Sequence, residues 1–254
     1  MSWAAKVALA PLLVWQGQRV RREALRLPEA KGPREGLADQ ATDRPHGLRL
    51  LIVGDSSAAG VGVATQADAL AAPLAEALAR RLGAPVAWQL VATSGHRAAD
   101  ALAAIRTAQL APADVMLAVL GVNDAVAMAR ASRWLATLDA LHACAAQRAG
   151  VRMSWHSGLP PMGRFPLLPQ PLRWVLGREA ARLDRALQRH VEGRLDRRHV
   201  PLPPTPAGAL PEGWVAADGY HPGPAGYRAW VETLAEALVA SWPASPPAAP
   251  HCGQ

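Results

Sequence analysis

One serine and one histidine, each in a rigid local setting, are the first candidates for catalytic residues. Ser56 directly follows a buried-looking aliphatic run that ends in glycine and aspartate. His221 lies three residues after Asp218, on a short loop that contains a glycine and is followed by proline. A carboxylate at that spacing can hold the imidazole in the tautomer that accepts a proton, and a serine hydroxyl needs such a base to become a good nucleophile. The pattern predicts nucleophilic catalysis by a serine.

Five short apolar segments predict strands, and in the stretches between them the apolar residues recur at the spacing of a helix. Together they predict the scaffold that holds the serine and the histidine. The predicted strands are residues 48–53, 86–91, 115–120, 151–156 and 199–202. The predicted helices are residues 67–82, 98–108, 132–148, 178–194 and 224–241, with Ser132 as a helix cap. Strands that alternate with helices form a parallel sheet covered on both faces. We therefore expect an α/β three-layer sandwich with five parallel strands, in which Ser56 lies at the sheet edge where ligands bind.

Four short blocks of the sequence resemble those of the SGNH hydrolases, also called GDSL esterases and lipases. In chain order the blocks are Gly54-Asp55-Ser56, Thr93-Ser94-Gly95, Gly121-Val122-Asn123-Asp124 and Asp218-Gly219-Tyr220-His221-Pro222. The resemblance spans residues 54–222 and implies a flavodoxin-like sheet and ester hydrolysis. The sequence has no complete dinucleotide or nucleotide motif and no cluster of histidines and carboxylates, so we expect no cofactor or metal. The resemblance implies that Ser56 is the nucleophile, that His221 is its base and that Asp218 orients His221. It also implies an oxyanion hole formed by the N–H groups of Ser56 and Gly95 and the side-chain amide of Asn123.

Some features of these blocks leave alternatives open. Ser57 stands where the family name has leucine, so it is a second candidate for the nucleophile. Position 58 is alanine, which disfavours the Gly-x-Ser-x-Gly elbow of the α/β-hydrolases. A simpler interpretation is that Asp55 and Ser56 only turn the chain and cap the next helix.

The expected activity is hydrolysis of carboxylic esters through an acyl-enzyme, in a lipase-like or lysophospholipase-like form if the substrate is a lipid. Carbohydrate deacetylation and acyl transfer are the alternatives within this chemistry. A non-catalytic, membrane-associated binding module is the alternative from another class, and the intact set of five site residues argues against it. Four residues could line an apolar acyl pocket, although core packing would explain them equally well: Trp155, Leu159, Met162 and Trp214.

The first 27 residues are apolar and then rich in arginine, which suggests contact with a membrane surface. Residues 3–15 form an apolar run that contains Pro11 and is too short to span a bilayer, for which about 20 apolar residues are needed. Arginines follow where a signal peptide would carry small residues. The tryptophans and arginines of residues 3–22 suit a membrane surface, and a helix docked on its own domain is the alternative. The sequence favours a bacterial-type cytoplasmic or peripheral membrane location and leaves secretion open.

The rest of the chain is expected to form a linker at residues 28–45, one hydrolase domain at residues 46–242 and a disordered tail at residues 243–254. The chain has 254 residues, of which 50% are hydrophobic, and this is enough for one α/β domain. The net charge is +7, but no nucleic-acid-binding motif accompanies it, so we expect no nucleic-acid partner. Histidines other than His221 are expected at the surface or at helix caps. A stripe of arginines is interpreted as a solvated helix face: Arg178, Arg182, Arg185 and Arg189.

Overall fold

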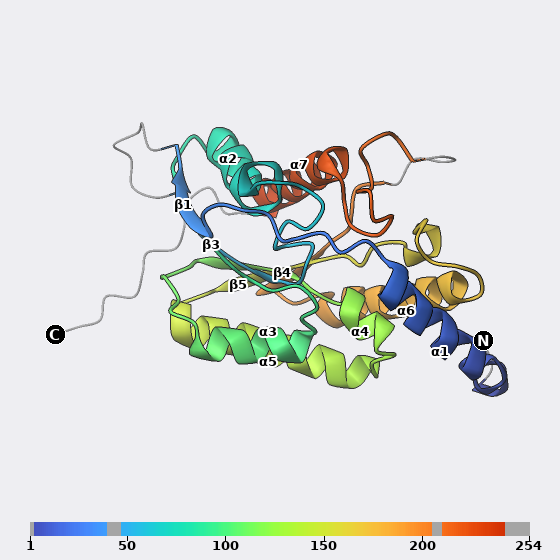
Figure 1. Ribbon diagram of the computed structural model, residues 1–254. Helices are drawn as coiled ribbons and strands as arrows, with labels where there is room; N and C mark the ends of the chain where they lie inside the picture. The colour runs from blue at the N-terminus through green and yellow to red at the C-terminus, as the bar shows by residue number, and fades with distance from the viewer. Residues whose placement is uncertain (1–2, 40–46, 205–209, 242–254) are drawn as a thin grey trace.

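The computed structural model describes residues 3–39, 47–204 and 210–241, with side chains from residue 9 onward, and Figure 1 shows its α/β architecture. A six-stranded sheet has the order β1-β3-β2-β4-β5-β6. Five strands are parallel: β2 (Leu48–Gly54), β3 (Val86–Ala92), β4 (Val115–Val119), β5 (Met153–Ser157) and β6 (Arg197–Val200). These five confirm the predicted parallel sheet.

The sixth strand, β1 (Glu35–Ala38), corrects the predicted strand count. It lies within residues 28–45, which the sequence predicts to be a linker, and it pairs antiparallel with β3 at the sheet edge. Gly36 lies so close to Trp88 that a Cβ there would be 3.0 Å from the indole nitrogen. The position of β1 depends on its pairing with the backbone and side chains of β3. The segment therefore needs no alternating apolar pattern of its own. The predicted start of the domain at residue 46 and the tail at residues 243–254 lie outside the described residues.

Two layers of helices cover the sheet, as Figure 1 shows. On one face lie α2 (Ala71–Leu82) and α7 (Pro224–Ser241). On the other face lie α3 (Ala98–Thr107), α5 (Ala131–Ala149) and α6 (Leu172–Val191). In β2, Leu50 and Ile52 face the first layer while Leu51 and Val53 face the second. The unbroken aliphatic run of this strand follows from its burial on both faces.

Several helix boundaries differ from the sequence-based expectations. A 3-10 turn, η1 (Gln66–Asp68), precedes α2, and the short α4 (Val122–Val126) was not expected. Ser132 lies inside α5, whose N-terminus has no side-chain cap. The helix α6 begins six residues before the predicted position, because Leu172, Val175 and Leu176 already pack into the core.

The N-terminal helix α1 (Trp3–Glu23) continues through Pro11 and contacts α6. Gln16 is 6% exposed, and its side chain donates to the carbonyl oxygen of Gln170 (2.7 Å) and accepts from the N–H of Leu172 (3.1 Å). Leu13 and Val20 pack against the core cluster that contains α6. These contacts fix α1 against the domain. Within the described residues, none of the helices has the length and apolar character needed to cross a bilayer.

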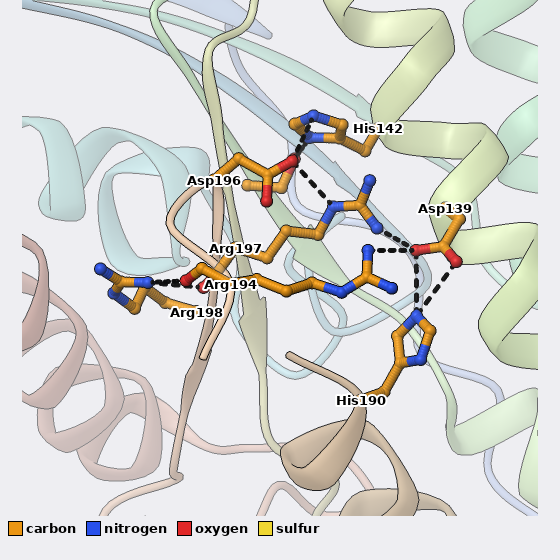
Figure 2. Close-up of polar contacts among 8 residues, drawn as sticks. Asp139, His142, His190, Arg194, Asp196, Arg197 and Arg198 are labelled. Atoms are coloured by element: carbon orange, nitrogen blue, oxygen red, sulfur yellow. Dashed lines mark hydrogen bonds and ion pairs between the residues drawn. The ribbon is translucent and has the colours of Figure 1, made fainter. Parts of the chain in front are cut away.

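A polar network at the amino end of β6 joins this strand to α5 and α6, as Figure 2 shows. Asp139 of α5 accepts hydrogen bonds from Arg197 of β6 and from His190 of α6, the latter at 3.0 Å. Burial alone would raise the pKa of Asp139, but the hydrogen bond from His190 and the charge of Arg197 outweigh it and lower that pKa. Ser56 follows the carboxyl end of β2, whereas the network lies at the amino end of β6. Because β2 and β6 run in the same direction, Ser56 and the network lie at opposite ends of the strands.

Two histidines are buried, contrary to the expectation that they lie at the surface or at caps. His142 is 9% exposed and its Nδ1 lies 2.6 Å from the hydroxyl of Ser154. His156 is 2% exposed, and burial lowers its pKa to about 3, so it is neutral at physiological pH. His156 belongs to β5, where burial on both faces of the sheet places it in the interior.

Candidate active site

Ser56 lies in a tight turn directly after β2, and α7 holds this turn in place. A carboxylate oxygen of Asp55 accepts the N–H of Ser57 (3.0 Å). The buried hydroxyl of Tyr227, in α7, lies 2.9 Å from the carbonyl oxygen of Ser57 and 2.8 Å from that of Val61. The turn is therefore rigid. Sequence reasoning missed Tyr227, because nothing in the local sequence distinguishes it from an ordinary core aromatic.

His221 lies on a tight loop that ends where α7 begins, at Pro224 as the sequence predicts. One carboxylate oxygen of Asp218 accepts the backbone N–H groups of Tyr220 (2.9 Å) and His221 (3.0 Å). Gly219 takes the left-handed conformation, with φ +68°, which this turn requires and which glycine adopts without strain. The backbone of the loop thus fixes the orientation of the Asp218 carboxylate.

The Ser56 turn and the His221 loop touch at Gly62. Its φ is +110°, and a Cβ at this position would lie 2.1 Å from the carbonyl oxygen of Pro222. Any side chain larger than hydrogen would therefore push the two segments apart. Gly62 permits the close approach that brings His221 to Ser56.

The three predicted residues of the serine–histidine–aspartate set lie within hydrogen-bonding distance of one another. The Nε2 of His221 lies 2.8 Å from the Oγ of Ser56, and its Nδ1 lies 2.6 Å from Asp218. Burial would raise the pKa of Asp218, but the hydrogen bonds from the ring and backbone of His221 and the backbone of Tyr220 outweigh it and lower that pKa. Asp218 is therefore ionised and lies as a carboxylate beside the imidazole ring of His221. The imidazole faces the Ser56 hydroxyl, while the main chain of Ser57 binds Asp55 and Tyr227.

Gly95 and Asn123, the other predicted site residues, follow β3 and β4, the two strands that flank β2. Asn123 donates from Nδ2 to the carbonyl oxygen of His96 (3.0 Å), and this nitrogen lies 3.4 Å from the carboxylate of Asp55. Gly95 has φ +86°, and a Cβ at this position would point into open space. Burial raises the pKa of Asp55 to about 7, although the N–H of Ser57 and the charge of His221 act in the opposite direction. The carboxyl ends of β2, β3 and β4 thus bring Ser56, Gly95 and Asn123 to the same side of the sheet.

An apolar cavity of about 130 Å³ opens beside Ser56 and His221. Its walls come from the loop after β5, the segment after β6 and the residues before and within α7, including Leu159, Pro161, Phe165, Leu202, Trp214 and Trp230. Leu159 and Trp214 therefore lie where an acyl pocket was predicted. Trp155 and Met162 do not, because both are fully buried in the two core layers. Gly95 and Asn123 do not line the cavity.

The described residues contain no group of three or more histidine, cysteine, aspartate or glutamate side chains arranged to hold a metal ion. The chemistry that this arrangement offers is a hydroxyl beside an imidazole, with an apolar cavity next to them.

Several solved structures share the fold of this chain. TesA is 22% identical, with a TM-score of 0.59, and the match covers 76% of this chain and 99% of that chain. The psychrotrophic esterase EstA from Pseudoalteromonas sp. is 16% identical, with a TM-score of 0.54 and coverage of 76% and 97%. A carbohydrate esterase family 2 enzyme from Corynascus thermopiles is 16% identical, with a TM-score of 0.52 and coverage of 79% and 68%. At these identities the likeness shows a common fold.

The family follows from the sequence itself. A search of curated proteins finds no match to the chain. The family profile described as GDSL-like lipase/acylhydrolase matches residues 52–229, which is more than half of the chain and contains the Ser56 turn, the β3 and β4 ends and the His221 loop. The chain therefore belongs to the GDSL-like lipase/acylhydrolase family and is an ester hydrolase.

Proposed function

We propose that Ser56 attacks the carbonyl carbon of a carboxylic ester and forms an acyl-enzyme. The observation that carries this proposal is the 2.8 Å distance between the Nε2 of His221 and the Oγ of Ser56. Because Nδ1–H donates to Asp218, Nε2 is free to accept the serine proton as Oγ bonds to the carbonyl carbon. The imidazolium then gives that proton to the leaving alcohol as the ester C–O bond breaks. Water repeats the sequence on the acyl-enzyme and releases the acid.

The negative oxygen of the tetrahedral intermediate needs donors that are in place before the reaction. We propose the backbone N–H groups of Ser56 and Gly95 and the side-chain amide of Asn123. One amide hydrogen of Asn123 is donated to His96, and the other points to Asp55 over a long contact of 3.4 Å. That weakly held hydrogen is the one that would turn to the oxyanion.

We propose an ester with an acyl chain as the substrate, because the cavity beside Ser56 is lined mainly by apolar side chains. A carbohydrate deacetylase or an acyltransferase would use the same residues, and a structural neighbour is described as a carbohydrate esterase. A sugar, however, needs polar partners that the apolar walls of this cavity supply poorly. A non-catalytic binding module would have no need for the hydrogen-bonded set of Ser56, Asp218 and His221.

The test is hydrolysis of p-nitrophenyl esters, from acetate to long acyl chains, by the full chain and two variants. Ser56→Ala should lower kcat by about 10³ or more, because it removes the nucleophile. Ser57→Ala is the matched control and should keep its activity, because its side chain takes no part in the proposal. Equal rates for Ser56→Ala and the unaltered chain would refute the assignment. A preference for acetate over all longer esters would refute the acyl pocket.

A further inference from the structure

Two half-exposed tryptophans lie on neighbouring helices, and each has an arginine one turn later above its ring. Trp15 of α1 is 51% exposed, and the guanidinium carbon of Arg19 lies 5.6 Å from its ring centroid. Trp174 of α6 is 43% exposed, and the corresponding carbon of Arg178 lies 5.3 Å away. The helices α1 and α6 contact each other and lie together in Figure 1. Neither tryptophan belongs to the core, so core packing does not explain this repeated arrangement.

The surface around these pairs combines exposed apolar side chains with arginines. Leu12 of α1 is 41% exposed and lies three residues before Trp15, on the same side of the helix. Arg22 lies seven residues after Trp15 on that side, and Arg19 also pairs with Glu23 (2.9 Å). We call this surface the α1–α6 face and define it by Leu12, Trp15, Arg19, Arg22, Trp174 and Arg178. Large exposed apolar side chains beside arginines are typical of an interaction surface.

The α1–α6 face lies beside the entrance of the active-site cavity. Gln16 ties α1 to the start of α6, and the loop that leads into α6 forms one wall of that cavity. A groove of about 540 Å³ along α6 is lined by Trp174, Arg178 and Arg185. Pro161 lines both this groove and the active-site cavity. A flat partner that covered the face would therefore meet the cavity entrance.

We propose that the α1–α6 face docks on an anionic phospholipid bilayer and holds the cavity entrance at the lipid surface. Indole rings prefer the headgroup level, arginines bind lipid phosphates, and an exposed leucine gains free energy by entering the acyl boundary. An acidic protein would satisfy the arginines but not the apolar side chains between them. The inference rests on the proposed function, because docking beside the cavity is useful when the ester is a lipid.

The experiment is sedimentation of the full chain with phosphatidylcholine vesicles, with and without phosphatidylglycerol. We expect binding to the phosphatidylglycerol vesicles only, and weaker binding at high salt. The double variant Trp15→Ser/Trp174→Ser should bind about tenfold more weakly, because both indoles leave the interface. Leu195→Ser is the matched control and should bind normally, since Leu195 is 83% exposed but lies next to β6 at the opposite sheet edge. Arg22→Gln/Arg178→Gln should also bind more weakly, and it tests the same face if the tryptophan variant does not fold.

Equal sedimentation with both kinds of vesicle, or unchanged binding by both double variants, would overturn the proposal. So would a change of oligomeric state in the tryptophan variant without a change in vesicle binding, because the face would then bind a second copy of the chain. Hydrolysis of soluble p-nitrophenyl acetate separates the two proposals, since all these variants should hydrolyse it at the unaltered rate. Vesicle binding by a chain that hydrolyses no ester would refute the proposed function and leave the docking surface standing.

Discussion

Replacing Asp218 by asparagine should move the proton of the His221 ring from Nδ1 to Nε2. The backbone hydrogen bonds of the loop can all stay in place. In the unaltered chain one carboxylate oxygen accepts the N–H groups of Tyr220 (2.9 Å) and His221 (3.0 Å), and the other lies 2.6 Å from Nδ1. Asparagine can keep both backbone hydrogen bonds only with its carbonyl oxygen in the first position. Its amide nitrogen then faces Nδ1. Two donors cannot pair, so the ring must carry its proton on Nε2, where it can no longer accept the proton of Ser56.

The size of the effect follows from the loss of the general base. The corresponding substitution in a studied serine protease lowers kcat about 10⁴-fold, and each tenfold loss corresponds to about 1.36 kcal/mol of barrier. We expect Asp218→Asn to lower kcat about 10³- to 10⁴-fold, which is about 4 to 5.5 kcal/mol. KM should change little, because Asp218 is buried behind His221 and does not line the cavity.

The assay is hydrolysis of a short p-nitrophenyl ester, with thermal unfolding followed by circular dichroism on the same sample. Asp139→Asn is the matched control, because Asp139 also accepts a hydrogen bond from a histidine but lies at the opposite edge of the sheet. Its kcat should stay within a few-fold of the unaltered value at temperatures where it is folded. A folded Asp218→Asn variant that loses less than about tenfold in kcat would refute the tautomer argument.

Three further predictions follow from the same structure. Asn123→Ala should lower kcat about 10²- to 10³-fold with little change in KM, because its amide would act only on the developing oxyanion; a change in KM alone would contradict that role. Gly62→Ala should lower both kcat and the melting temperature, because its Cβ would lie 2.1 Å from the Pro222 carbonyl oxygen and its φ of +110° adds on the order of 1–3 kcal/mol of strain; a crystal structure with an unchanged distance between Ser56 and His221 would count against it. Asp139→Asn should lower the melting temperature at neutral pH. Because the folded-state pKa of Asp139 is lowered, its contribution to stability is present above the ordinary carboxyl pKa and is lost as the pH falls through the lowered value. The difference between this variant and the unaltered chain should therefore shrink below about pH 4, and a difference that persists there would show that the Asp139 charge is not its source.

The central strands could be predicted from the sequence because burial on both faces leaves an unbroken aliphatic run. The predicted starts of β2, β3 and β4 are those of the structure, and their ends differ by one residue. The polar residues that end these strands are also visible in the sequence. For the same reason the sequence predicts that Ser56 and Asn123 lie together at the carboxyl ends of the strands.

Features that depend on other parts of the chain could not be predicted. The strand β1 has its place because β3 offers a free edge, and its four residues carry no pattern of their own. From the sequence, Trp155 and Trp214 are both candidates for the acyl pocket, but Trp155 is buried in the core and Trp214 lines the cavity. The support that Tyr227 gives to the Ser56 turn joins residues about 170 positions apart, and only the packing of α7 reveals it.

A fluorophosphonate bonds to activated serine hydroxyls, and peptide mass spectrometry of the labelled protein identifies which serine is the nucleophile. We expect one label on Ser56 in the unaltered chain and in Ser57→Ala, no label in Ser56→Ala and much slower labelling in Asp218→Asn. A label on Ser57, or a folded and unaltered chain that takes no label at all, would contradict the assignment of Ser56 as the nucleophile.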